Sequence, residues 1–506
     1  MQLKQNKHIS LYLSIFLLTL LYLVAWPFYK YVLDPDGACY AAIAEQYAKG
    51  HVKDAINNVW SPLHEWLIIP FIKLGVYAPY AFKYSNLFIG SGILLIIHSF
   101  LIKSDLEKSL QTCLLLCLTV ILSYCIWHEL AADLPFCLIV LIYMKITYEK
   151  NFHLDHNKNM LAGFIGGLGY LTKAIGLPFF LIHFSLIHFW NDWSLKGKGN
   201  YIKGLILFFI VASPWIFILY KNHGIWSYSS AGALNMSWQL DPAVSKELTF
   251  LSPPHKYAFS HWENPWYDHS VLHSPFDSFT NFIKLTRQIL YNFQEYLKAM
   301  LRISFLSISI SFISLINLMR TPTKRSLYIF IGIFLLPTGY IMYHYDDRYL
   351  WPVSIFILIA GTFYVRHFFS MYSFRKSHRF FIWLLYFGSF LIEPINQLKD
   401  SVYKDKEMYE LANLLHLNGI EHSFTSNKKN IECGVIGYIN RIKYYAPNQP
   451  TNDIQALLSK AKKENIKYCL FFYKNKHEKE CVLNAISGNS YKSVKNINHQ
   501  TIAFEL

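Results

Sequence analysis

Residues 9–29 read ISLYLSIFLLTLLYLVAWPFY, a nearly continuous apolar run. About 20 helical residues cross the ~30 Å hydrocarbon core of a bilayer, so this run predicts a membrane-spanning helix. No small-residue cleavage site follows it, and we therefore interpret it as a signal anchor. Ten further apolar runs predict an α-helical polytopic membrane protein with about eleven spans. They are 80–102, 110–126, 134–147, 160–172, 175–190, 204–220, 298–319, 326–343, 351–367 and 380–396.

The composition also favours a membrane protein. Of 506 residues, 53% are hydrophobic and only 16% are charged, whereas soluble domains carry roughly 25% charged residues. The net charge is +15, but Lys and Arg occur in short clusters between the apolar runs and form no single basic face. A nucleic-acid partner is therefore not expected.

The positive charges predict the orientation, because cytoplasmic loops are enriched in Lys and Arg. With Met1 in the cytoplasm, the basic clusters lie on the cytoplasmic side. The short outer loops 127–133 and 344–350 then contain a single Lys or Arg residue, Arg348. The tail after about residue 396 has no apolar spans. There we expect helices over 400–417 and 452–465 and a buried strand over 467–473.

Two domains are predicted on this basis. The first is a membrane domain over residues 1–396 with long outer loops at 30–79 and 221–297. The second is a small soluble α/β domain over 397–506, outside the cytoplasm and large enough to fold by itself.

Two carboxylates stand where the first span leaves the bilayer, in the segment LDPDGACYAAIA at 33–44. A carboxylate there can act as a general base on an incoming hydroxyl, and Asp36 is the first candidate, with Asp34 the second. The alternative is that either aspartate only caps the helix that follows. Further candidates for substrate binding are Tyr40 on this helix and His64 and Glu65 in the segment WSPLHEW at 60–66.

Lys173 lies between two predicted spans, in the segment GYLTKAIGLP at 169–178. Counting ~1.5 Å per residue from Met160 places it roughly 20 Å across the bilayer, where an ammonium is costly unless it snorkels, pairs or meets an anion. Gly176 and Pro178 indicate a broken helix of the kind that lines cavities. Snorkelling and anion binding are both open interpretations for this lysine.

Two outer turns add charges at the same face of the membrane. The turn HELAADLP at 128–135 contains Glu129 and Asp133, and Asp133 precedes a helix that it could simply cap. The turn YHYDDRYLWP at 343–352 contains Arg348. This arginine either pairs with Asp346 or Asp347, or binds a phosphate, for which a guanidinium is well shaped.

Within the outer loop 221–297, the stretch 255–273 holds four histidines beside two tryptophans: His255, His261, His269, His273, Trp262 and Trp266. The histidine spacing matches no zinc motif, so a metal is not expected. The tryptophans predict either an interfacial aromatic belt or a surface on which a sugar stacks. The eight cysteines lack CxxC-type spacing, and a disulfide among the four outside the membrane stays open. ATP-driven transport has no support, because no Walker loop is present.

These motifs all lie on the predicted outer face of the membrane. Their order along the chain resembles that in the GT-C superfamily of glycosyltransferases, which use polyprenyl-phosphate sugars. Within it, the chain is similar to the branch of protein O-mannosyltransferases and lipid A aminoarabinose transferases. Pro35-Asp36 with Tyr40 matches the motif after the first span of that branch, and Leu171-Thr172-Lys173 and Arg348-Tyr349-Leu350 resemble two later landmarks. Gly37 and Cys39 depart from the pattern, which often has an acidic residue and an arginine there.

The resemblance implies an inverting membrane glycosyltransferase with Asp36 as base and with Lys173 and Arg348 on the donor phosphate. Substrate contacts would come from Tyr40, His64, Glu65, Glu129, Asp133, Asp347 and Trp262. No metal or other cofactor is expected. The expected partners are a polyprenyl-phosphate-sugar lipid, the bilayer and a glycan, lipid or protein acceptor, and the expected location is a bacterial inner membrane. The competing hypothesis is a non-enzymatic lipid or polyol transporter or flippase that uses the same charges at a helix break.

Overall fold

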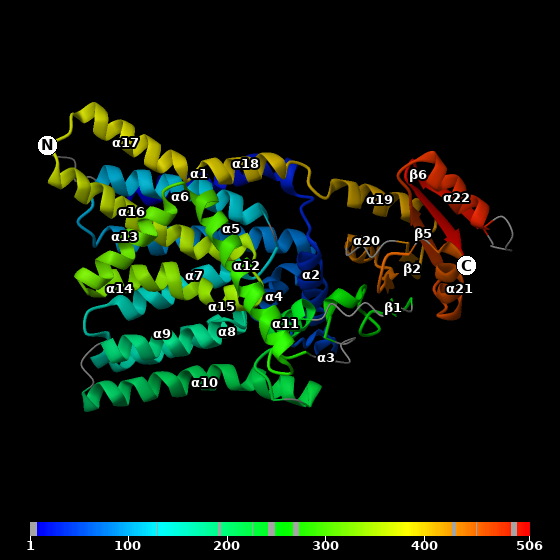
Figure 1. Cartoon of the computed structure of the whole chain (residues 1–506), viewed down its shortest axis with the longest axis horizontal. Helices are drawn as coiled ribbons and strands as arrows, with labels where there is room; N and C mark the ends of the chain where they lie inside the picture. The colour runs from blue at the N-terminus through cyan, green and yellow to red at the C-terminus, as the bar shows by residue number, and fades with distance from the viewer. Residues whose placement is uncertain are drawn as a thin grey trace.

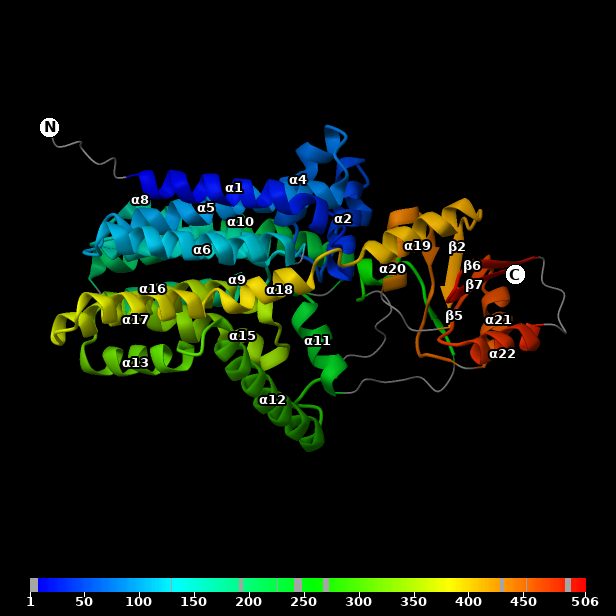
Figure 2. The ribbon, with the colours of Figure 1, turned by 90° about the horizontal axis from the view of Figure 1, so that it is seen from above.

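The computed structural model describes residues 8–128, 130–190, 194–224, 226–240, 248–266, 273–427, 432–451, 453–486 and 493–506. Long helices lie side by side in one bundle, and a small sheet with its helices stands at one end of it (Figures 1 and 2). The chain is thus a polytopic α-helical membrane protein with a small C-terminal α/β unit, as predicted.

Seven stretches of the described chain are long and apolar enough to cross a membrane. Each of them coincides with a predicted span. They are α1 (Ile9–Tyr29), α5 (Ala78–Leu101), α6 (Lys108–His128), α10 (Leu195–His223), the run of α14 (Lys324–Phe330), η3 (Ile331–Leu335) and α15 (Leu336–Tyr343), the run of η4 (Asp347–Leu350) and α16 (Trp351–Met371), and the run of α17 (Lys376–Ser389) and α18 (Ile392–Asp400). The predicted spans 134–147, 160–172 and 175–190 form the shorter helices α7 (Asp133–Tyr148), α8 (His156–Thr172) and α9 (Gly176–Trp190), with the short turn η1 (Phe152–Leu154) between the first two.

The predicted span 298–319 is wrong as a single helix. It is divided between α12 (Phe279–Ile303) and α13 (Ser307–Arg320), which meet at an angle of 106°. Ser304 leaves the helical conformation at the bend, with φ −166° and ψ 140°. Its buried hydroxyl lies 2.6 Å from the hydroxyl of Ser389 on α17, so a tertiary hydrogen bond accompanies the break.

The outer segments pack at the end of the bundle that faces the sheet (Figure 2). The first folds as α2 (Pro35–Ala48), α3 (Val52–Ala55) and α4 (Leu63–Lys73). The second contributes α11 (Ala231–Leu240), β1 (Phe250–Leu251) and the 3-10 turn η2 (His261–Glu263). These segments, together with the ends of the long helices, form the surroundings of the candidate site.

The C-terminal unit contains a five-stranded sheet with the order β3-β2-β5-β7-β6. β2 (Ser423–Ser426) pairs in parallel with β3 (Lys443–Tyr444) and β5 (Tyr468–Phe472), whereas β7 (Thr501–Glu505) is antiparallel to β5 and β6 (Ser493–Asn498). The helices are α19 (Lys406–Leu417), α20 (Glu432–Asn440), α21 (Ile454–Lys463) and α22 (Lys476–Ile486), and β4 (Ala446–Pro447) pairs with β1 of the outer loop.

The local predictions for the tail hold in two cases of three. β5 and α21 confirm the strand over 467–473 and the helix over 452–465. The helix over 400–417 begins only at Lys406, because Tyr403 and Asp405 adopt positive φ angles of 56° and 65°. The domain boundary at 396 stays a prediction, and that residue lies within α18. All eight cysteines are free.

Candidate active site

The two aspartates lie at the start of α2, and Asp34 caps this helix. Its Oδ2 accepts a hydrogen bond from the Gly37 N–H at 3.1 Å, and its Oδ1 accepts one from the Leu130 N–H at 3.2 Å. A Cβ at position 37 would lie 2.8 Å from Asp34 Oδ1, so the close approach requires glycine. Burial, and then the charge of Asp36, raise the pKa of Asp34. Of the two interpretations open for these aspartates, general base or helix cap, the structure supports the helix cap for Asp34.

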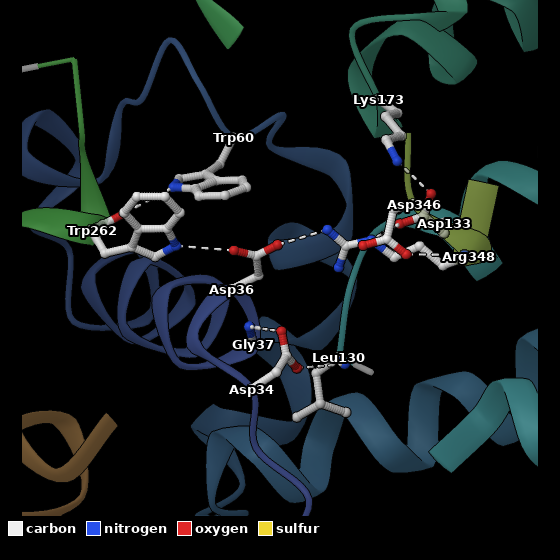
Figure 3. Close-up of polar contacts among 10 residues, drawn as sticks. All are labelled: Asp34, Asp36, Gly37, Trp60, Leu130, Asp133, Lys173, Trp262, Asp346 and Arg348. Carbon is white, nitrogen blue, oxygen red and sulfur yellow. Dashed lines mark hydrogen bonds and ion pairs between the residues drawn. The ribbon is translucent and has the colours of Figure 1, made fainter. Parts of the chain in front are cut away.

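Asp36, in the first turn of α2, points to the other side of the helix terminus, as Figure 3 shows. Its Oδ1 accepts a hydrogen bond from Trp262 Nε1 at 3.0 Å, and its Oδ2 accepts one from Arg348 Nη2 at 2.8 Å. Three segments far apart in sequence thus meet at this carboxylate. Because both of its oxygens are held, its orientation is fixed before any substrate binds.

Arg348 links Asp36 to two further carboxylates. Its Nε lies 3.5 Å from Asp133 Oδ2 and 3.8 Å from Asp346 Oδ2. The Arg348 side chain is only 12% exposed and that of Asp133 only 5%, and charges interact more strongly at such sites than in bulk water. The predicted pairing of Arg348 with Asp346 is therefore present, alongside its contacts with Asp36 and Asp133.

Lys173 completes a group that we call the charged cluster: Asp36, Asp133, Lys173, Asp346 and Arg348. The Lys173 ammonium forms an ion pair with Asp133 Oδ1 (Figure 3). It also lies 4.1 Å from the centre of the Tyr349 ring and 5.0 Å from that of Tyr340, where cation–π attraction adds to the ion pair. The side chain is thus directed into the protein and does not snorkel to the surface.

The helix break that Gly176 and Pro178 indicated is present, and it places Lys173 in the charged cluster. α8 ends at Thr172, Lys173 is extended with φ −153° and ψ 132°, and α9 begins at Gly176. A Cβ on Gly176 would lie 2.5 Å from the carbonyl carbon and oxygen of Gly169. The two helices therefore approach at a distance that only glycine allows.

A cavity of about 500 Å³ adjoins the charged cluster, a size that suits a small ligand or a head group. Asp36, Asp133, Lys173 and Arg348 line it, together with Tyr40 of α2. With Trp262 of η2, which also lines it, the cavity brings together six residues that the sequence analysis had selected from five separate segments. Their chemical roles remain predictions.

Aromatic side chains form another part of the cavity lining. Trp60 donates a hydrogen bond from Nε1 to the Trp262 carbonyl at 3.3 Å, and Trp238 stacks on Trp262 with ring centres 5.5 Å apart. Sequence reasoning missed Trp238, Tyr340 and Tyr349 as lining residues. For Trp238 a signal exists, because Trp238 and Gln239 stand three and four residues after Asn235, and positions i, i+3 and i+4 form one stripe on a helix.

Three of the remaining sequence candidates, all on described parts of the chain, do not line the cavity. His64 and Glu65 on α4 are buried, with 0% and 1% exposure, and neither lines the cavity. Asp347 does not pair with Arg348, because it binds Arg302 with distances of 2.6 Å and 3.0 Å. Glu129 lies outside the described residues.

The described residues contain no cluster of metal ligands. No group of three or more His, Cys, Asp or Glu side chains there could hold a metal ion. This statement applies to only part of the histidine-rich loop, because His269 lies outside the described residues. The expectation that no metal is needed stays untested.

The fold is similar to that of solved membrane proteins. The crystal structure of ArnT from Cupriavidus metallidurans in the apo state has a TM-score of 0.56 and 11% identity, covering 98% of this chain and 97% of that one. The same protein bound to undecaprenyl phosphate has a TM-score of 0.53 and 10% identity over the same shares. An Archaeoglobus fulgidus oligosaccharyltransferase in complex with Zn and sulfate has a TM-score of 0.55 and 11% identity, covering 92% of this chain and 68% of that one.

These similarities confirm the predicted fold, which this chain shares with ArnT and with the oligosaccharyltransferase. No family model matches the sequence, and no curated protein matches it either. The similarity is thus visible in three dimensions and not in overall sequence.

Proposed function

We propose that this chain is an integral membrane glycosyltransferase that moves a sugar from a polyprenyl-phosphate donor to a hydroxyl group of an acceptor. The observation that carries the proposal is the charged cluster, in which a fixed carboxylate and two cations share one cavity at the end of a membrane-spanning bundle. The similar fold of ArnT, which has been crystallised with undecaprenyl phosphate, supports this class of donor.

The proposed reaction assigns one task to each part of the cluster. The acceptor oxygen attacks the anomeric carbon with inversion, its proton passes to Asp36, and the bond from that carbon to the phosphate oxygen breaks. The phosphate leaves as an anion, and Lys173 and Arg348 stabilise its developing charge. The activated bond is already present in the donor, so the proposal needs no nucleotide, and Lys173 and Arg348 supply the positive charge for the leaving phosphate.

Arg348 contributes both to the proton transfer to Asp36 and to the departure of the phosphate. A guanidinium presents five N–H donors in a planar fork, so it can orient Asp36 and contact a phosphate at the same time. The stacked rings of Trp238 and Trp262 offer an apolar face for the sugar or the acceptor. Asp133 acts as a positioning residue, because it contacts both cations.

We place this site on the extracytoplasmic side, in a bacterial inner membrane. The connections at the other end of the bundle carry Lys103, Lys150, Arg320 and Arg375, and such enrichment is typical of cytoplasmic loops. In this orientation the N-terminus is cytoplasmic, and the predicted domain over 397–506 lies outside. The acceptor class, whether glycan, lipid or protein, is left to experiment.

The test is sugar transfer in membrane vesicles that contain endogenous acceptors. The probe is polyprenyl phosphate that carries a labelled sugar, from a panel that includes mannose and aminoarabinose. Asp36→Asn should lower transfer by about 10²-fold or more, as expected when a general base is removed. Asp54→Asn is the matched control, because this carboxylate lies on α3 and does not line the cavity.

Two outcomes would contradict the proposal. Full transfer by Asp36→Asn at equal protein level would exclude Asp36 as the base. Movement of the labelled lipid across the vesicle membrane without cleavage of the sugar–phosphate bond would instead support the transporter hypothesis.

A further inference from the structure

A second cavity of about 670 Å³ lies at the opposite end of the bundle and is larger than the one at the charged cluster. α7 connects the two, since Asp133 at its start lines the first cavity and Tyr148 at its end lines the second. At ~1.5 Å per residue these ends are roughly 22 Å apart. The second cavity is therefore a separate feature at the other face of the membrane.

Cations dominate the polar part of this second cavity. Five of its lining side chains are Lys or Arg, against two carboxylates, Asp105 and Glu149. Both carboxylates already have partners, since Glu149 lies 2.9 Å from Lys158 and Asp105 lies 2.6 Å from Arg366. Lys145 and Arg325, by contrast, have no carboxylate of the described chain within ion-pairing distance. The cavity thus presents an excess of positive charge.

The rest of the lining is apolar and comes from helices of the bundle. Met144 of α7, Phe100 of α5, and Ile359 and Phe363 of α16 contribute to it. The guanidinium of Arg325 lies 3.4 Å from the centre of the Phe363 ring, so a fixed cation marks the border between the charged and apolar parts. A ligand that matches both parts has an anionic head and a hydrocarbon chain.

We propose that this cavity binds an anionic phospholipid, with its phosphate at Lys145 and Arg325 and one acyl chain between α7 and α16. Basic pockets between spanning helices bind anionic head groups in this way, because the phosphate relieves the repulsion between neighbouring cations. The site lies in the leaflet opposite the charged cluster. It is thus distinct from the proposed donor site and does not depend on the glycosyltransferase proposal.

The experiment uses the delipidated full-length chain in detergent, with lipid binding measured by native mass spectrometry. The chain should bind phosphatidylglycerol more tightly than phosphatidylcholine. Lys145→Gln with Arg325→Gln should weaken phosphatidylglycerol binding about tenfold or more and leave phosphatidylcholine binding unchanged. The matched control is Lys196→Gln with Lys203→Gln, on α10 and outside the cavity lining, which should change binding by less than about twofold.

A substitution in the apolar part of the second cavity tests the proposal independently of the double variant, in case that variant is unstable. Ile359→Trp fills the space for the acyl chain and should weaken binding of both lipids. Equal binding of the two lipids by the unaltered chain would overturn the proposal, and so would unaltered phosphatidylglycerol binding by the double variant. Displacement of phosphatidylglycerol by stoichiometric polyprenyl phosphate would also overturn it, because the site would then belong to the carrier lipid.

Discussion

At the scale of single residues, Arg348 is held by three carboxylates, those of Asp36, Asp133 and Asp346. A planar guanidinium can reach several partners in fixed directions, whereas a lysine ammonium is a compact point charge on a flexible stem. The shape of this side chain therefore matters as much as its charge. The proposed role of Arg348 on the donor phosphate depends on the same geometry.

Arg348→Lys should lower kcat for sugar transfer by roughly 10- to 100-fold, because the positive charge remains but the fixed contacts to Asp36 and the phosphate are lost. The measurement is initial-rate kinetics at equal protein level. Arg302→Lys is the matched control, since Arg302 pairs with Asp347 away from the cavity, and it should change kcat by less than about threefold. An equal decrease in kcat in the two variants would contradict the proposed role of Arg348.

Glu263 provides a residue-scale prediction of pH dependence. It is buried next to Trp262, its Oε1 accepts a hydrogen bond from the Phe259 N–H at 2.6 Å, and burial raises its pKa from 4.5 to about 8. Between these two values the folded chain keeps a proton that the unfolded chain releases. A rise in pH through this window therefore favours unfolding.

The measurement is the Tm in detergent from pH 5 to pH 8.5. The Tm of the unaltered chain should fall as the pH rises, and Glu263→Gln should reduce this slope because its side chain does not titrate. Glu407→Gln, at an exposed position of α19, should keep the slope of the unaltered chain. An unchanged slope in Glu263→Gln would contradict the assignment of the bound proton to Glu263.

The sequence was informative about a residue wherever that residue broke a local rule. Lys173 stood between apolar runs, and Arg348 stood in an outer loop that otherwise lacked cations. Tyr340 and Tyr349 broke no such rule, because aromatic residues make up 17% of the chain. The contact of Asp347 with Arg302 was equally hidden, since the sequence offers Arg348 as the nearer partner.

At the scale of elements, the break between α8 and α9 depends on the contact of Gly176 with Gly169. Gly176→Ala should destabilise the protein by about 1–3 kcal/mol, because the added methyl group forces the two helices apart. Gly199→Ala on α10 meets nothing within 4 Å and should instead stabilise by up to about 1 kcal/mol. Thermal unfolding in detergent measures both, and equal stability of the two variants would contradict this account of the break.

Apolar runs located the helices well, but two interruptions could not be predicted. The bend at Ser304 is stabilised by Ser389 of another helix. The interruption before α19 is stabilised by the Tyr403 N–H, which donates to the Phe28 carbonyl at 3.0 Å, and by Asp405, which accepts from the Leu33 N–H at 2.9 Å. These partners are distant in sequence, so local patterns contain no information about them.

At the scale of the whole molecule, the C-terminal unit contacts the helix that carries Asp36. Glu45, also on α2, accepts hydrogen bonds from Tyr438 Oη at 2.7 Å and from Arg441 Nη2 at 2.8 Å. The pairing of β1 with β4 adds a second connection. The sequence predicted the small α/β unit but not this contact, because Glu45 and Arg441 lie 396 residues apart.

The most direct test of the central claim is a cryo-EM map of the full chain with polyprenyl phosphate bound. The account predicts density for the phosphate within hydrogen-bonding distance of both Lys173 and Arg348, beside Asp36. Phosphate density at the Lys145 and Arg325 cavity, or anywhere away from the charged cluster, would contradict it.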